Sequence, residues 1–279
     1  MKTDLSPRVR VALYGLLCVL AIPFVFPTWW MVTSSVKPIS DIFAFPPDII
    51  PRSFDFSTYG DVFRLQPFAQ QYWNSCYIAA IVTVGTMAVS SMAGYAFARI
   101  KFPGRSMFFG MMIATLLLPF HVVIIPQYII FQQLGLVDTY VPLLIGKFLA
   151  ADAFFVFLMV QFMRNLPAEL DEAARIDGAG HVRIFASIML PLMKPALIST
   201  SIFSFIWSWN DFLGPLLYLN TPEKYPLPLA LRLFVDQTQS SDYGAMIAMS
   251  VLALLPVLVF FLVFQRYIVE GVSTQGLKG

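Results

Sequence analysis

Long apolar runs separated by short polar segments dominate the pattern of this 279-residue chain. A helix that crosses a bilayer needs about 20 mostly apolar residues, and six stretches of the chain meet that length. They cover residues 11–31, 73–98, 106–130, 140–163, 195–219 and 244–265. The pattern therefore predicts an all-α integral membrane protein with six transmembrane helices, whose connecting segments are too short to form a soluble catalytic domain.

The composition supports a membrane protein and excludes several other classes. Hydrophobic residues make up 58% of the chain and charged residues 12%, whereas about a quarter of a soluble domain is charged. A net charge of +2 is too small for a phosphate-binding stripe, so no nucleic-acid partner is expected. Cys18 and Cys76 lie in separate apolar runs, and His121 and His181 are far apart in sequence. We therefore expect neither a disulfide framework nor a metal site.

Basic residues predict the orientation. The first apolar stretch follows Lys2, Arg8 and Arg10, and it is too long for a signal peptide, so we interpret it as an uncleaved span. With the N-terminus inside, most basic residues fall in inner segments. The longer outer segments hold Lys37, Arg52, Arg64, Lys224 and Arg232. The positive-inside rule then places both termini in the cytoplasm. The outer loop over residues 32–72, rich in proline and aspartate, is expected to form a compact cap with an interfacial segment.

Small and proline residues within the spans carry a less specific signal. Thr86, Ser90, Gly94 and Ala98 recur every four residues, a spacing that lets membrane helices approach closely. Prolines lie in or beside several spans, and they are compatible with a transport path or with simple kinks.

Ionisable and amide side chains inside the spans carry more information. Lys147 and Asp152 lie in the fourth stretch, and Asn210 and Asp211 lie in the fifth. They indicate polar packing within the bundle or the lining of a substrate path. A proton relay is less favoured because it needs a chain of such groups across the bilayer, and Lys147 is close enough to a helix end to snorkel.

Motifs of several enzyme classes are absent. The chain contains no Gly-x-Ser-x-Gly elbow, no His-Glu-x-x-His zinc motif and no Gly-x-x-x-x-Gly-Lys-Ser/Thr phosphate loop. We therefore expect that the chain is not an enzyme, and that any ATP it depends on is bound by another chain.

The inner loop over residues 164–194 predicts a short amphipathic helix. Pro167 suits the first turn, and the acids that follow suit the positive end of the helix dipole. At about 100° per residue, one stripe holds Leu170, Ala173 and Ala174, and the other side holds Asp171, Glu172 and Arg175, with Asp171 and Arg175 paired. A helix lying on headgroups would be basic with large apolar anchors. An acidic start and an alanine face favour docking in a groove of a protein partner.

This loop resembles the signature loop of permease subunits of binding-protein-dependent ABC importers. The matching positions, with the intervening spacing intact, are Glu172, Ala173, Ala174, Gly178, Ile188, Leu190 and Pro191. Residues 135–139, 176–178, 209–213 and 265–279 are similar to the maltose-type G-subunit permease and its carbohydrate-importer relatives. The resemblance covers nearly the whole chain, and six spans fit this subunit better than its larger partner.

The resemblance implies a type I ABC importer permease fold in one transmembrane domain, residues 1–279. Its parts would be a first span and periplasmic loop over 11–72, a core module over about 70–266, and an ATPase-docking loop over 164–194. A second permease subunit would complete a heterodimer in the bacterial plasma membrane. Two ATPase subunits would bind ATP and Mg²⁺, which leaves this chain without a cofactor, and a solute-binding protein would deliver a sugar or oligosaccharide.

The resemblance also implies site residues. The docking loop would act through Glu172, Ala173, Ala174, Asp177, Gly178, Ile188, Leu190 and Pro191. The C-terminal tail would approach the ATPase dimer through Gln275, Gly276, Leu277 and Lys278. A sugar path would want hydrogen-bonding groups and aromatic faces, which Asn210, Asp211, Trp207 and Trp209 could supply. The tryptophans could equally form an interfacial belt or pack in the core.

Other functions stay open at this point. The same importer class could carry glycerol phosphate or a polyol, although a phosphate ligand would want cations along the path and Lys147 is the candidate. A stand-alone secondary transporter would work without ATP and could show inverted repeats, which are not detected. A non-transporting scaffold is disfavoured by the intact docking loop.

Overall fold

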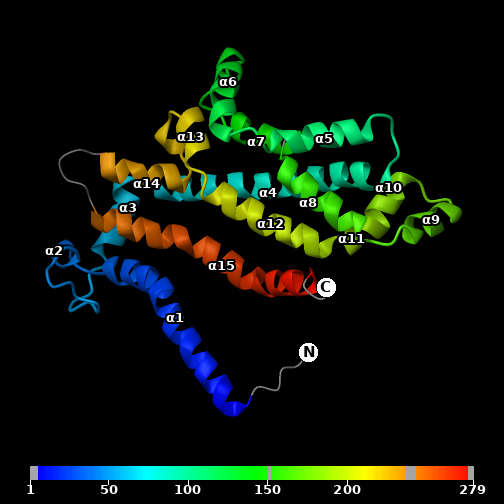
Figure 1. The fold of residues 1–279 in the computed structure, drawn as a ribbon. Helices are drawn as coiled ribbons and strands as arrows, with labels where there is room; N and C mark the ends of the chain where they lie inside the picture. The colour runs from blue at the N-terminus through cyan, green and yellow to red at the C-terminus, as the bar shows by residue number, and fades with distance from the viewer. Residues whose placement is uncertain (1–5, 150–151, 237–242, 276–279) are drawn as a thin grey trace. The chain divides into compact units, whose positions relative to one another are not determined.

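The computed structural model describes residues 6–149, 152–236 and 243–275, and all of its regular elements within these ranges are helical (Figure 1). Helices suit an apolar chain because each satisfies its own backbone hydrogen bonds. The first half contains α1 (Pro7–Ser34), α2 (Ile39–Ile42), α3 (Ser57–Leu65), α4 (Phe68–Arg99), α5 (Arg105–Thr115), α6 (Phe120–Gln133) and α7 (Val141–Phe148). The second half contains α8 (Ala153–Arg164), α9 (Glu169–Ile176), α10 (His181–Ile184), a π-helical turn (Phe185–Met189), α11 (Leu190–Leu192), α12 (Lys194–Trp209), α13 (Leu213–Tyr218), a 3-10 turn (Pro222–Lys224), α14 (Leu227–Asp236) and α15 (Tyr243–Gln275).

Four helical segments of the described chain are long and apolar enough to cross a membrane. They are Pro7–Ser34, Phe68–Arg99, Tyr243–Gln265 and Val141–Arg164, the last counted from α7 to α8 across residues 150–151, which lie outside the described residues. A fifth is counted if His181–Leu192 and Lys194–Trp209, bent by 75°, form one span. Their positions agree with the expected first, second, fourth and sixth spans. The chain is thus a multi-pass helical protein, but residues 106–130 and 195–219 do not form continuous helices.

Prolines explain both interruptions. A proline ring clashes with the carbonyl four residues earlier, and it disfavours a helical conformation in the residue before it. Pro119 is four residues beyond Thr115, where α5 ends, and α6 begins just after it. Pro215 is likewise four residues beyond Asp211. There α12 ends at Trp209, and the chain becomes helical again at the start of α13. The expected third and fifth spans are therefore each divided in two.

The chain divides into two compact units, one of residues 1–68 with 231–255 and one of residues 69–230 with 256–279. In the first unit, most of α1 is exposed, whereas Thr33, Ser35 and Lys37 at its end are buried. Lys37 donates a hydrogen bond to the carbonyl of Asp48, and the Thr58 hydroxyl donates to the carbonyl of Ser35 at 3.0 Å. The outer loop is therefore folded onto the end of α1 as a compact cap.

In the second unit, α8 lies against α4 and α12 (Figure 1). The small-residue stripe of α4 is buried at Thr86, Ser90 and Gly94. At Gly94, a Cβ atom would lie 2.6 Å from Cβ of Met159 on α8, so the two backbones approach as closely as a glycine permits. The neighbouring core joins α4 and α8 to the inner loop through Tyr95, Met159, Met163, Ala174, Ile184, Met189, Met193 and Ala196.

Candidate functional site

The helix α9 forms the tip of the inner loop, and its two ends are defined by its sequence. Three acids occupy its first turn and Arg175 its last, in agreement with the helix dipole. Beyond Asp177, Gly178 has a φ of +79°, in the left-handed region that favours glycine. The amide of Gly178 donates to the carbonyl of Arg175 at 3.0 Å, and the amide of Ala179 donates to that of Ala174 at 2.9 Å. This pair of bonds is a Schellman motif, which stops the helix after two turns.

The buried face of α9 differs from the expected one. Asp171 and Ala174 face the protein interior, with 4% and 7% of their surface exposed. Leu170 and Ala173, expected beside Ala174, are exposed. The predicted pair of Asp171 with Arg175 is wrong, because the Asp171 carboxylate lies 3.3 Å from Nε of Arg99 at the end of α4. A buried cation from a distant helix draws the acid inward, which the local pattern cannot show.

The outward face of α9 contains Glu172, Ala173 and Ile176, all exposed. Ile176 is 86% exposed, and Val182 in the adjoining α10 is 82% exposed. We call these four residues the docking face. A carboxylate among small and branched apolar side chains is a surface that a protein groove with one basic group would complement.

The remaining docking-loop residues differ in how far they are buried. Ala174 belongs to the core cluster, and Ile188 packs against it. Leu190 is half-buried, and Pro191 is exposed in the first turn of α11, where the missing amide hydrogen is tolerated. Of the loop residues predicted from the sequence, Ala174 and Ile188 thus meet in the core cluster, whereas Glu172 and Ala173 lie on the exposed face of α9.

The predicted tail residues are mostly outside the described chain. Gln275 ends α15, and Gly276, Leu277 and Lys278 lie outside the described residues. Their approach to an ATPase dimer stays a prediction.

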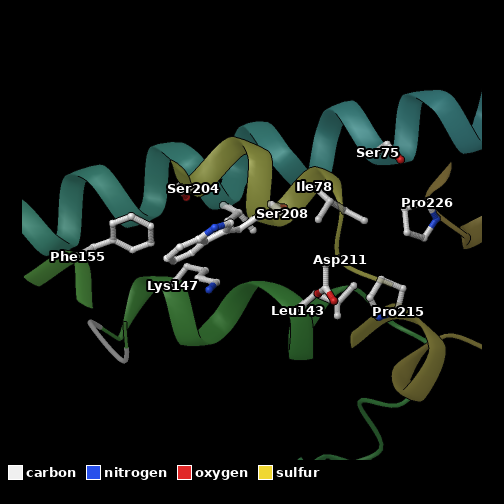
Figure 2. Close-up of a pocket in the computed structure, with 12 residues that line it drawn as sticks. Ser75, Ile78, Leu143, Lys147, Phe155, Ser204, Ser208, Asp211, Pro215 and Pro226 are labelled. Carbon is white, nitrogen blue, oxygen red and sulfur yellow. The ribbon is translucent and has the colours of Figure 1, made fainter. Parts of the chain in front are cut away.

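A cavity of about 410 Å³ lies between α4, α7, α8 and α12 (Figure 2). In Figure 2, Lys147 and Leu143 rise from α7, Ser204 and Ser208 come from α12, and Asp211 lies where α12 ends. The lining residues are Ser75, Ile78, Val82, Leu143, Lys147, Phe155, Ser204, Trp207, Ser208, Asp211, Pro215 and Pro226. The wall thus combines hydroxyls, the two aromatic rings of Phe155 and Trp207, and two charged groups with an apolar remainder.

The four predicted path residues take different positions. Trp207, 52% exposed, and Asp211 line the cavity. The Asn210 amide donates to the carbonyl of Ile206 at 2.8 Å, so it caps its own helix and is not among the lining residues. Trp209 is 4% exposed and is packed in the core against neighbouring rings.

The structure adds lining residues that sequence reasoning did not select. Ser204 and Ser208 precede Asp211 at helical spacing, so the break at Asp211 and this spacing could have indicated them. Lys147, the cation that the sequence places within a span, has its Nζ 2.7 Å from Oδ2 of Asp152. The cation in the wall therefore already has a carboxylate partner.

A second polar cluster ties together the loop between α6 and α7 and the loop after α13. Asp138, with a φ of +61°, accepts hydrogen bonds from the amides of Asn220 and Thr221, from the Thr221 hydroxyl and from Nζ of Lys224, the last at 2.7 Å. The Lys224 ammonium also donates to the backbone carbonyl of Asp138. These bonds hold the pKa of the Asp138 carboxyl well below its usual range, and the bond from Lys224 contributes most. The cluster, which we call the outer clamp, fixes the loop after α13.

Three comparisons with known proteins identify the group to which this architecture belongs. The family described as binding-protein-dependent transport system inner membrane component matches residues 87–274. The arabinooligosaccharides transport system permease protein AraQ of Halalkalibacterium halodurans is 33% identical over the full length of both chains. The trehalose transport system permease protein SugB of Mycobacterium tuberculosis is 31% identical, over 91% of this chain and 92% of that one.

Further relatives show that the group carries more than one solute. The sn-glycerol-3-phosphate transport system permease protein UgpE of Brucella abortus is 32% identical, over 88% of this chain and 89% of its own. Among solved structures, a chain of a bacterial ABC transporter involved in the import of the acidic polysaccharide alginate has the same fold, with a TM-score of 0.82, 24% identity, and coverage of 96% of this chain and 99% of that one. The expectation of a transport permease and not an enzyme is confirmed. This chain belongs to the family of binding-protein-dependent transport system inner membrane components.

Proposed function

We propose that this chain is one of two permease subunits of an ATP-driven importer for a neutral sugar or oligosaccharide. The observation that carries the proposal is the docking face, in which Glu172, Ala173 and Ile176 project from a short helix held by buried contacts. Exposing Ile176 and Val182 to water is unfavourable, and a protein partner that covers them removes this cost. The partner we assign to this face is an ATPase subunit, in keeping with the family.

Glu172 supplies the charge for this contact. An exposed carboxylate within an apolar face would be desolvated when a partner covers it, so it requires a basic group opposite. Truncating one member of such a pair costs about 2–5 kcal/mol. ATP and Mg²⁺ would be bound by the ATPase, whose closing would pull on α9. The C-terminal residues 275–278 would add a second contact with the ATPase dimer.

The second permease subunit would cover much of the surface that this chain leaves exposed. In the most apolar 18-residue stretch of α1 no residue is buried, and in the corresponding stretch of α15 11% of the residues are buried. Lipid or another helical chain must therefore surround these two helices. Six spans require that α5 with α6, and α12 with α13, each cross as a broken pair. With six spans, the predominance of basic residues in the inner segments would put both termini in the cytoplasm of the bacterial cell.

The cavity favours a neutral, hydroxyl-rich solute. Ser75, Ser204 and Ser208 offer donors and acceptors, and the exposed face of Trp207 can stack on a sugar ring. Among the described lining residues, Lys147 is the one cation, and its charge is offset by Asp152. A phosphate would need unpaired cations. The names of AraQ and SugB point to saccharides, whereas that of UgpE keeps glycerol phosphate as the second candidate.

Reconstitution tests the proposal. This chain, its partner permease, the ATPase and the solute-binding protein are placed in proteoliposomes, and uptake of labelled trehalose, arabinotriose and sn-glycerol 3-phosphate is measured with and without ATP. We expect uptake of a sugar that requires ATP and every subunit. Uptake by this chain alone without ATP would instead identify a secondary transporter, and uptake of only the phosphate ester would refute the neutral-solute assignment.

A variant pair tests the docking face directly. Glu172→Ala should weaken copurification of the ATPase and abolish uptake, whereas Glu223→Ala, also exposed but beside the outer clamp, should leave both unchanged. Wild-type assembly and uptake in Glu172→Ala would refute the assignment of this face.

A further inference from the structure

Arg99, the last residue of α4, contacts three separate parts of the second unit. Its terminal nitrogen donates to the carbonyl of Met163 at 2.7 Å and to that of Leu166 at 2.8 Å. Its Nε lies 3.3 Å from Oδ2 of Asp171. The first two acceptors are at the C-terminal end of α8 and just beyond it, where carbonyls lack partners within the helix. One guanidinium therefore joins α4, α8 and α9.

The pair is buried from water. The side chain of Arg99 is 9% exposed and that of Asp171 is 6% exposed. Oδ1 of Asp171 has no hydrogen-bond partner among the described residues, so the carboxylate depends on Arg99 for its stabilisation. Two buried opposite charges resist separation, because either charge left alone would be strongly unfavourable.

The other contacts of α9 with the unit do not fix its direction. Ala174 adds a small apolar contact to the core cluster, and a single methyl group buries too little area to hold the helix in place by itself. A helix of eight residues is also too short to hold its shape in isolation. Arg99, by contrast, is fixed to the end of α8 by two directional hydrogen bonds. From that fixed position its charge holds the Asp171 carboxylate at 3.3 Å, as an ion pair in which Nε makes no hydrogen bond to any described residue.

We propose that the Arg99–Asp171 pair is the mechanical link through which movement of α9 is transmitted to α4 and α8. The inference rests on the proposed function, because it takes α9 to be the element that an ATPase moves. Both residues are positioning residues: neither contacts solute or ATPase, and their role is to keep α9 rigidly attached to the two helices that line the cavity. With the link intact, closing of the ATPase turns α4 and α8; without it, α9 moves alone.

The test uses the complete importer in proteoliposomes and compares Asp171→Asn with Glu169→Gln. Both variants remove one negative charge from α9, but Glu169 is exposed and outside the pair. The measurements are ATPase copurification, ATP hydrolysis, and the number of solute molecules imported per ATP, with the sugar that the wild-type complex imports as the probe.

We expect Asp171→Asn to retain the ATPase and to hydrolyse ATP while uptake per ATP falls by about tenfold, the scale of coupling changes along such networks. Glu169→Gln should keep the wild-type ratio, and Asp171→Glu, which restores the charge, should recover part of it. A wild-type ratio in Asp171→Asn would overturn the link. Loss of ATPase copurification in Asp171→Asn would also overturn it, since the pair would then serve assembly alone. Absence of ATP-dependent uptake in the wild-type complex would instead refute the proposed function.

Discussion

Replacing Gly94 with alanine tests the closest approach between two helices of the second unit. The new Cβ atom would lie 2.6 Å from Cβ of Met159 and 3.4 Å from two backbone atoms of α8, whereas carbon atoms prefer about 3.5–4.0 Å. Truncating Met159 to alanine cannot relieve this clash, because alanine keeps the same Cβ. The helices must therefore separate locally by about 1 Å, and overpacking of this kind costs about 1–3 kcal/mol.

Gly110 on α5 provides a matched control, since an added Cβ there meets nothing within 4 Å. Gly110→Ala should be neutral or stabilising by up to about 1 kcal/mol, because alanine favours a helix over glycine. The assay is thermal unfolding of the purified importer in detergent. We expect a lower midpoint for Gly94→Ala than for wild type. Equal midpoints for Gly94→Ala and Gly110→Ala would refute the close-packing argument.

Three further predictions concern the outer clamp, the cavity and the docking face. The lowered pKa of Asp138 means that its contribution to stability is present above the ordinary carboxyl pKa and is lost as pH falls through the lower folded value. Asp138→Asn should therefore lower the thermal midpoint at neutral pH and flatten its decline on acidification; a wild-type pH profile in the variant would contradict this. Trp207→Ala should reduce sugar uptake while Trp207→Phe retains part of it, with assembly checked by gel filtration, and unchanged uptake in Trp207→Ala would remove the ring from the path. Ile176→Ser should weaken ATPase binding by about 1.5–3 kcal/mol without changing the thermal midpoint of the free permease pair, and titration with ATPase would show an unshifted affinity if Ile176 lies outside the interface.

The sequence predicts those parts of the fold that depend on local properties. Length and hydropathy are sufficient to locate α1, α4 and α15, because each long helix makes its backbone hydrogen bonds within its own segment. The sequence shows Pro119 and Pro215 within the expected third and fifth spans, but a proline in a span can either kink a helix or end it. Which of these happens depends on whether neighbouring groups satisfy the freed backbone, and this is a tertiary property.

Contacts between distant segments account for what the sequence did not predict. Asp171 has a plausible partner four residues away, yet it pairs with Arg99 from another helix, because burial in the folded unit outweighs a weak exposed pair. Trp207 and Trp209 are about 200° apart around α12, so only one of them can face the cavity. The sequence alone does not indicate which one, since both are tryptophans within an apolar run.

The two-turn length of α9 has a consequence for affinity. Eight residues rise about 12 Å along a helix, so one docking face covers far less than the roughly 800 Å² per partner that stable complexes bury. A single permease subunit would therefore hold an ATPase weakly. Two permease subunits, each with such a helix, would engage an ATPase dimer bivalently, and the second contact would form at high effective concentration. Firm attachment of the dimer would then be compatible with release of either ATPase from its own helix, so that avidity, not the strength of one contact, holds the importer together.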